Sequence, residues 1–216
     1  MTKEQIIERL LHPGVVAIIR ADSSGQLIDA SRALIDGGVS AIEITMTTPR
    51  ALEVIADVRR TFGDKVLAGV GSVLDVPTTR AALEAGAQYV VTPVLRPDVI
   101  ACCREMKIPV FAGSYTPTEA QVAFELGADF IKIFPADGLG PQYISAILGP
   151  LPHLKIVPTG GIDVNTAGDF IRAGCVAVAA GGSLVGREIL KTRDWTRLSE
   201  RAAQFVAAVA QARSPA

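Results

Sequence analysis

The chain repeats one pattern, in which an amphipathic helix is ended by a glycine and followed at once by a short apolar strand. Four segments show this pattern most clearly, with their glycines at Gly38, Gly86, Gly127 and Gly174. A glycine at this place takes the left-handed conformation that ends many helices. Four further apolar runs stand between these units, namely VVAIIR, KVLAGV, IPVFAG and KIVPTGG. The pattern therefore predicts eight strands that alternate with helices.

We place these strands near residues 15–20, 41–45, 66–70, 88–92, 108–112, 129–134, 155–159 and 176–180. Continuous Val/Ile-rich strands separated by helices are typical of a parallel sheet covered by helices. Eight such units in 216 residues favour a single-domain (β/α)8 TIM barrel over residues 1–216, with an additional helix at each end of the chain. A doubly wound open sheet is the alternative, but the turn after the first strand lacks the G-x-G-x-x-G fingerprint.

Composition makes several kinds of partner improbable. The formal net charge is −1 and there is no long basic run, so we expect no nucleic-acid binding. No segment holds 18 consecutive apolar residues, so we expect no membrane span. The N-terminus carries charges where a signal peptide needs an apolar core, and the three cysteines lack paired spacing. We therefore expect reduced thiols and a cytoplasmic location.

The two histidines limit the chemistry further. His12 precedes a Pro-Gly pair, His153 lies in a short loop, and neither has a Cys, Asp or Glu neighbour at metal-ligand spacing. No G-x-S-x-G motif accompanies them, so a serine triad is not expected. We predict no metal site, and we expect any acid or base in an active site to be a carboxylate or a lysine.

One lysine interrupts a strand that otherwise reads as fully buried. Alternation within DFIKIFP (129–135) turns its two isoleucines toward the helices and sends Phe130, Lys132 and Phe134 into the barrel. Burying an unpaired ammonium group costs several kcal/mol, so such a lysine is either half of a buried ion pair or a group kept neutral for chemistry. We predict a functional Lys132.

The same alternation turns Glu43 of AIEIT (41–45) and Arg20 of VVAIIR (15–20) inward. An arginine at a strand end is often only a solvated residue beginning a loop, but here three charges converge on the end where barrels build active sites. A neutral lysine there can attack a ketone to form a Schiff base, and desolvation by its phenylalanine neighbours favours that neutral form. Glu43 is then the carboxylate that moves protons.

Two Gly-Gly turns follow the last two predicted strands, at Thr159-Gly160-Gly161 and at Gly181-Gly182-Ser183. Backbone N–H groups at such turns bind phosphate in many barrels. No basic side chain is obvious there, so we expect the backbone and Ser183 to supply most of the binding. The segment 69–72 either approaches a ligand in the same way or serves close helix–strand packing. With an anion at Arg20, these features imply a keto acid that carries a distal phosphate.

Five motifs together resemble the class I aldolases that cleave 2-keto-3-deoxy-6-phosphogluconate: VVAIIRA (15–21), AIEITMTTP (41–49), AGVGSVLD (68–75), ADFIKIFPA (128–136) and VPTGGI (157–162). The resemblance runs from about residue 5 to about residue 190. It implies a barrel that forms a homotrimer and yields pyruvate and glyceraldehyde 3-phosphate through a Schiff base, without metal or cofactor. It also implies activity on 4-hydroxy-2-oxoglutarate.

Carried over residue by residue, the resemblance makes Lys132 the Schiff-base lysine and Glu43 the general acid/base. The residues around the pyruvyl part would be Arg20, Thr47, Ser72, Thr92, Pro93, Phe134 and Thr159. Those around the phosphate would be Gly160, Gly161, Gly181, Gly182 and Ser183.

Some positions depart from the family pattern. Thr47 stands where some members have an arginine, so either Arg20 or the nearby Arg50 binds the carboxylate. Tyr115 adds a phenol near the mouth, and the segment 140–144 resembles relatives that act on the galactonate epimer. The alternative functions are therefore a 2-keto-3-deoxy-6-phosphogalactonate aldolase, a phosphosugar epimerase or isomerase, and a non-catalytic binder of phosphorylated metabolites.

Overall fold

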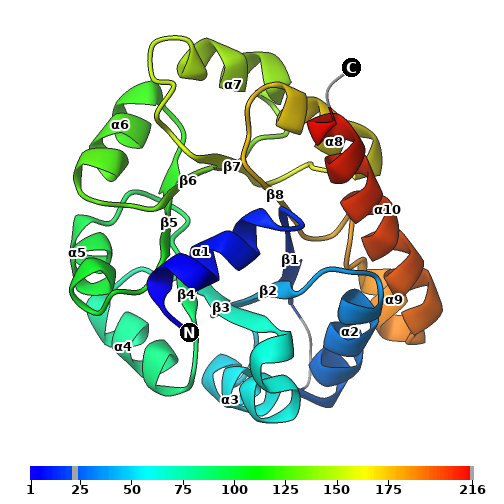
Figure 1. Ribbon diagram of the computed structural model, residues 1–216. Helices are drawn as coiled ribbons and strands as arrows, with labels where there is room; N and C mark the ends of the chain where they lie inside the picture. Colours follow the sequence, from blue (N-terminus) through cyan, green and yellow to red (C-terminus); the bar gives the residue numbers. More distant parts are fainter. Residues whose placement is uncertain (21–23, 215–216) are drawn as a thin grey trace.

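A computed structural model describes residues 1–20 and 24–214 and has eight parallel strands at its centre with helices around them (Figure 1). Neighbouring strands pair in the order β7-β6-β5-β4-β3-β2-β1-β8. Their bounds are β1 (Val15–Ile19), β2 (Ala41–Thr45), β3 (Leu67–Gly71), β4 (Tyr89–Val91), β5 (Val110–Ser114), β6 (Phe130–Ile133), β7 (Ile156–Pro158) and β8 (Val178–Ala180). The fold is the predicted (β/α)8 barrel, and each strand overlaps its predicted position.

Helices join successive strands and surround the barrel. They are α1 (Lys3–Leu11), α2 (Ser24–Asp36), α3 (Ala51–Phe62), α4 (Val76–Glu84), α5 (Pro97–Glu105), α6 (Pro117–Glu125), α7 (Gly140–Leu148), α8 (Val164–Arg172), α9 (Arg187–Thr192) and α10 (Trp195–Arg213), with a 3₁₀ turn, η1 (Gly63–Lys65), after α3. Gly38, Gly86, Gly127 and Gly174 have φ values of 88°, 104°, 97° and 105°. The predicted glycine stops after α2, α4, α6 and α8 are therefore confirmed. Among the described helices, none is both long and apolar enough to cross a membrane.

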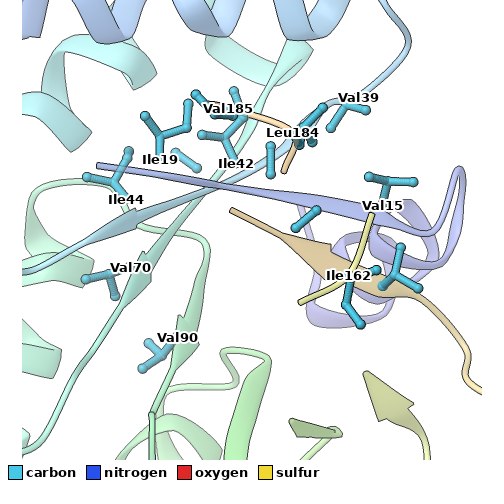
Figure 2. Packing of buried hydrophobic residues seen from close by; sticks show 14 of the residues in the cluster. Val15, Ile19, Val39, Ile42, Ile44, Val70, Val90, Ile162, Leu184 and Val185 are labelled. Atoms are coloured by element: carbon cyan, nitrogen blue, oxygen red, sulfur yellow. The ribbon is translucent and has the colours of Figure 1, made fainter. Parts of the chain in front are cut away.

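The barrel strands alternate between two apolar clusters. The outer cluster lies between the strands and the helices and contains Ile42, Ile44, Val70 and Val90 (Figure 2). The inner cluster fills the barrel and contains Val16, Ile18, Leu67, Tyr89, Phe111 and Phe130. Because odd and even positions separate in this way, the inward orientation predicted for β1, β2 and β6 is confirmed.

The first helix closes one end of the barrel. α1 lies across the opening (Figure 1), and its Ile6 and Leu10 belong to the inner cluster. This helix precedes β1, so it covers the end at which the strands begin. α1 does not cover the opposite end, where the strands finish, and this is the end at which barrel enzymes carry their active sites.

The ring of strands closes between β7 and β8. In the described part of the chain, one bridge between Thr159 and Ala179 joins them beyond the named strands, and the Val176 N–H donates to the Ile156 carbonyl oxygen at 3.0 Å. Every other neighbouring pair of strands has a register of at least two residue pairs. The closure is therefore the least extensively bonded junction of the ring.

Candidate active site

Lys132 and Glu43 meet inside the barrel, near the end at which the strands finish. They come from β6 and β2, and Lys132 Nζ lies 3.9 Å from Glu43 Oε1. Both residues are buried, with exposed fractions of 6% and 2%. Burial raises the pKa of Glu43, while the charges of Lys132 and Arg20 act against this rise. A carboxyl group with a raised pKa beside a buried amine is an arrangement suited to acid–base chemistry.

Two glycines of β3 make room for interior side chains. A Cβ atom added to Gly71 would collide with the Glu43 carboxylate, and one added to Gly69 would collide with the Tyr89 ring. Neither position therefore accepts a larger residue without moving its neighbour. Gly69 and Gly71 therefore provide space inside the barrel and not close contact with a helix, so the helix-packing alternative was wrong for these two glycines.

The floor and one wall of the lysine pocket are aromatic. Below Lys132, Phe130 stacks on Phe111 with ring centroids 4.4 Å apart. At the rim, Lys132 Nζ lies 5.2 Å from the centroid of the Phe134 ring, which is 37% exposed. The backbone of Pro93 lies against Gly113, which is the register partner of Lys132. The structure thus brings the predicted residues Phe134 and Pro93 together with Lys132.

Several buried hydroxyl groups have no hydrogen-bond partner within the described residues. They belong to Thr48, Tyr89, Ser114 and Thr159. Ser114 ends β5 and Thr159 follows β7, so they lie on the two strands that flank β6. Unpaired buried hydroxyls are rare, and a polar ligand in the barrel would satisfy that of Thr159, which lies on the inward side of its strand with Val157. Thr159 was among the predicted residues, whereas Ser114 is the register partner of Ile133 and faces the helices.

Three other predicted residues lie at the same end of the barrel. The Thr92 hydroxyl accepts a hydrogen bond from the Gly113 N–H at 3.0 Å, which ties β4 to β5. The Thr47 hydroxyl lies 2.8 Å from that of Thr45. Ser72 has a φ of 61°, a left-handed conformation that is uncommon for residues other than glycine. Their contacts with a substrate stay predictions.

A cavity of about 560 Å³ lies among the segments that follow β1, β2 and β8, and it carries three cations. Its lining includes Arg20, Thr47, Gly181 and Gly182, together with Arg187 and Lys191 of α9. Its lining residues, taken from the described chain, include no Asp or Glu. The cavity therefore favours an anion. From the sequence we expected backbone groups and Ser183 to bind most of the phosphate, and this expectation did not include α9. The two basic residues of α9 stand at positions i and i+4 of the helix that follows the second Gly-Gly turn.

The structure also separates the two candidate arginines. Arg20 lines the cavity, and its charge acts on Glu43. Arg50 begins α3 and forms an exposed ion pair with Glu53 at 3.5 Å. Arg20 is thus the better placed of the two to bind a carboxylate.

The two Gly-Gly turns are linked to each other. The Ser183 hydroxyl donates to the Ile162 carbonyl oxygen, and the Ser183 carbonyl oxygen accepts from Arg201 of α10 at 3.1 Å. Gly160 and Gly161 both have positive φ, at 95° and 70°, and Gly161 packs tightly against Asp137. In this arrangement the Ser183 hydroxyl proton is engaged between the turns, so its direct donation to a phosphate stays a prediction.

Two remaining features lie at the rim. The Tyr143 hydroxyl donates to the Tyr115 carbonyl oxygen at 2.6 Å, and the Tyr115 side chain is 45% exposed. The phenol of Tyr115 therefore stands at the mouth and not in the pocket. Within the described ranges, no three His, Cys, Asp or Glu side chains are grouped so that they could hold a metal ion.

Comparison with known proteins gives consistent results. The family model described as KDPG and KHG aldolase matches residues 6–201. The chain is 34% identical over 205 residues to the 2-dehydro-3-deoxy-phosphogluconate aldolase of Treponema pallidum, covering 93% of this chain and 97% of that protein. It is 33% identical over 201 residues to the 2-dehydro-3-deoxy-6-phosphogalactonate aldolase of Escherichia coli, covering 92% and 95%. A solved cube-shaped cage, designed by fusing symmetric oligomeric domains, matches with a TM-score of 0.85 and 32% identity over 93% of this chain and 73% of that one.

Proposed function

Because the chain belongs to the KDPG and KHG aldolase family, we propose that Lys132 forms a Schiff base with a 2-keto-3-deoxy-6-phospho sugar acid and that Glu43 moves the protons of its cleavage. The protein is an aldolase, which is a carbon–carbon lyase. The observation that carries the assignment of residues is the buried contact between Lys132 Nζ and Glu43 Oε1 at 3.9 Å. This contact places an amine and a carboxyl group together where water is largely excluded.

The neutral Lys132 amine attacks the C2 ketone of the substrate, and loss of water from the carbinolamine gives the iminium ion. Glu43 accepts the proton of the C4 hydroxyl group as the C3–C4 bond breaks. The bonding electrons move into the iminium group, which leaves an enamine on Lys132 and releases glyceraldehyde 3-phosphate. Glu43 then returns its proton to C3, and hydrolysis of the resulting iminium ion frees pyruvate and Lys132.

The binding part of the proposal assigns the two anionic ends of the substrate. Arg20 binds the C1 carboxylate beside the reacting carbonyl, with the buried hydroxyl of Thr159 as a further polar partner. The distal phosphate lies in the cationic cavity, between α9 and the two glycines that follow β8, Gly181 and Gly182. A charge of −2 there is matched by Arg187 and Lys191.

The configuration at C4 divides two closely related activities. Relatives named for the gluconate and the galactonate acids are 34% and 33% identical to this chain, so identity favours neither. We propose the gluconate acid as the main substrate, with 4-hydroxy-2-oxoglutarate as a second one, and the galactonate acid as the alternative. Cleavage rates for the three acids, followed as pyruvate release, decide among them. A higher kcat/KM for the galactonate acid would select the alternative.

Trapping the intermediate tests the chemistry directly. Incubation with pyruvate and then borohydride should add a reduced pyruvyl group to Lys132, identified by peptide mass spectrometry. Lys132→Met should abolish the adduct, while Lys155→Met, which changes an exposed lysine at the start of β7, should leave it intact. An epimerase or a non-catalytic binder would show no adduct on Lys132, and that result would overturn the proposal.

We further propose that the protein is a cytoplasmic homotrimer that acts on small keto acids without a cofactor. The match to a cage built from symmetric oligomeric domains supports an oligomer, and the three buried free cysteines support a reducing compartment. Light scattering should give three times the chain mass of 22.6 kDa. A mass equal to one or two chains would contradict the trimer.

A further inference from the structure

Glu43, Gly69 and Tyr89 form one row across the interior of the barrel. Glu43 of β2 is the register partner of Gly69 of β3, and Gly69 is the register partner of Tyr89 of β4. Because the middle member has no side chain, nothing separates the other two across β3. The mechanism above uses Glu43 and leaves Tyr89 without a role.

The Tyr89 ring fills the space that Gly69 leaves. A Cβ atom at Gly69 would collide with Cε1, Cζ and Cε2 of Tyr89, the atoms at the hydroxyl end of the ring. The Glu43 carboxylate occupies the next interior position of the same strand, above Gly71. Two residues along a strand span about 7 Å. Neighbouring interior positions are therefore too far apart for a direct hydrogen bond, whereas a single water can join two oxygens roughly 5.5 Å apart.

The Tyr89 hydroxyl group has no other use within the described residues. The residue is fully buried, and its hydroxyl lacks a hydrogen-bond partner. Phe111 covers the ring on the side away from β3, with ring centroids 5.6 Å apart. A phenylalanine would fill this space without burying an unpaired hydroxyl, which costs about 1–3 kcal/mol. The hydroxyl therefore calls for a polar partner inside the barrel.

We propose that Tyr89 is a positioning residue for Glu43, to whose carboxylate its hydroxyl donates through one bridging water molecule. The inference rests on the proposed function of Glu43. Burial and the charge of Glu43 both raise the pKa of Tyr89 well above its ordinary value, so the phenol keeps its proton and remains a donor. The donated hydrogen bond stabilises the ionised form of Glu43 against the effect of burial.

The pH dependence of Glu43 is set by groups on several strands. Lys132 of β6 and Arg20, directly after β1, favour its carboxylate, while burial favours its neutral form. Tyr89 of β4 adds a third contribution that favours the carboxylate. Removing this donor should raise the pKa of Glu43, and proton acceptance from the C4 hydroxyl requires the ionised form. The acid limb of kcat/KM should then move to higher pH.

The test is Tyr89→Phe, which removes only the hydroxyl group. We expect the acid limb of kcat/KM for cleavage of the phosphogluconate acid to rise by about one pH unit. Phe111→Leu disturbs the same aromatic cluster without touching a hydroxyl, and it should leave the limb in place. In a Glu43→Gln background, Tyr89→Phe should cause no further loss of turnover, because the group it positions is gone.

Two outcomes would overturn the inference. An unchanged acid limb in Tyr89→Phe, together with a higher melting temperature, would identify an unpaired hydroxyl that contributes nothing to Glu43. An equal shift in Phe111→Leu would assign the effect to packing. Borohydride trapping of pyruvate on Lys132 keeps this result separate from the proposed function, since Tyr89→Phe should still form the adduct and an unmodified native protein would instead contradict the Schiff base.

Discussion

At the scale of single residues, the site depends on a carboxyl group held in an unfavourable place. Glu43 is almost fully buried, and burial raises its pKa, whereas Lys132 and Arg20 partly restore the ionised form. The pKa of Glu43 is therefore set by two opposing effects, which are its burial and the positive charges near it. Such a balance suits a group that accepts a proton in one step and returns it in the next.

Glu43→Gln should lower turnover by about 10²- to 10⁴-fold, because the amide can neither accept nor return the proton. Pyruvate should still form a trappable adduct on Lys132, since the substitution leaves the amine in place. The measurement is pyruvate release in parallel with borohydride trapping. Unchanged turnover would remove Glu43 from its assigned role.

Gly71→Ala should reduce activity without unfolding the protein, because the added methyl group meets the Glu43 carboxylate. We expect the free energy of unfolding, measured with urea, to fall by about 1–3 kcal/mol. We also expect kcat to fall further than it does in other variants that lose the same free energy of unfolding. Gly25→Ala is the control, since nothing lies within 4 Å of the added atom and the position is helical. Activity equal to wild type in Gly71→Ala would contradict this packing.

Residue-level prediction succeeded where a strand's own alternation decided the outcome. The inward orientation of Lys132 and Glu43 follows from the neighbouring isoleucines of each strand. The roles of Gly69 and Gly71 could not be predicted, because the side chains that need their space belong to β4 and β2. Which residues face each other across strands depends on register, which a single sequence does not state.

At the scale of elements, α9 is short but well anchored. Ile189 and Leu190 are buried, and the Gln26 side chain of α2 donates to the Leu190 carbonyl oxygen at 2.7 Å. Arg193 ends the helix with a φ of 54°. This anchoring leaves Arg187 and Lys191, one turn apart, to line the cavity with Arg20.

Replacing Arg187 and Lys191 together by alanine should raise KM for the phosphorylated acid by roughly tenfold or more, because two charged partners of the phosphate are lost. The KM for 4-hydroxy-2-oxoglutarate, which has no phosphate, should change little. Arg197→Ala removes an exposed cation of α10 outside the cavity lining and serves as the control. Equal increases for both substrates would contradict a phosphate role for α9.

The sequence indicated α9 poorly for a physical reason. Six residues carry too little periodicity to mark a helix, and the Gly-Gly turn before them predicted only an anion site. The position of α9 is set by its contact with α2, about 160 residues earlier in the chain. Long helices such as α10, with buried Leu198, Ala202, Phe205 and Val209, were predictable because their apolar stripe is long enough to see.

At the scale of the whole molecule, the cysteines are distributed around the barrel. Cys102 and Cys103 lie on α5, Cys175 precedes β8, and all three are buried and free. Burial raises the pKa of Cys103 to about 12 and also raises that of Cys175. Neither Cys103 nor Cys175 therefore offers a reactive thiolate in the folded protein, and all three thiols are buried.

The three thiols should therefore react with Ellman's reagent only when the barrel opens. At neutral to mildly alkaline pH we expect negligible labelling of the native protein and three equivalents per chain in denaturant. Since α5, which holds two of the thiols, and the segment before β8, which holds the third, belong to one cooperative core, the three labelling rates should be equal. Rapid labelling of a single cysteine in native buffer would show that its element opens separately.

The architecture was predictable because its repeated units are alike. Each unit carries the same sequence signals. The number of strands and their parallel order were therefore predicted correctly, although the predicted strand ends differ from the observed ones by a few residues. No local signal in the chain states whether β8 returns to β7, so the closed barrel was predicted from the number of units alone. The Thr159–Ala179 bridge and the hydrogen bond from the Val176 N–H to the Ile156 carbonyl oxygen show the return.

The sparse bonding at this closure implies that a bound ligand can stabilise the ring of strands. β7 and β8 are the least extensively bonded neighbours, and the two Gly-Gly turns that follow them are linked by the hydrogen bond from Ser183 to Ile162. A ligand that contacts both of these turns would hold β7 and β8 together. Amide hydrogens of β7 and β8 should then exchange with deuterium more slowly when substrate analogue is bound, while those of β3 change less. Equal slowing of exchange in β3 and β8 would show that binding stabilises the whole barrel and that β7 and β8 do not open separately from the other strands.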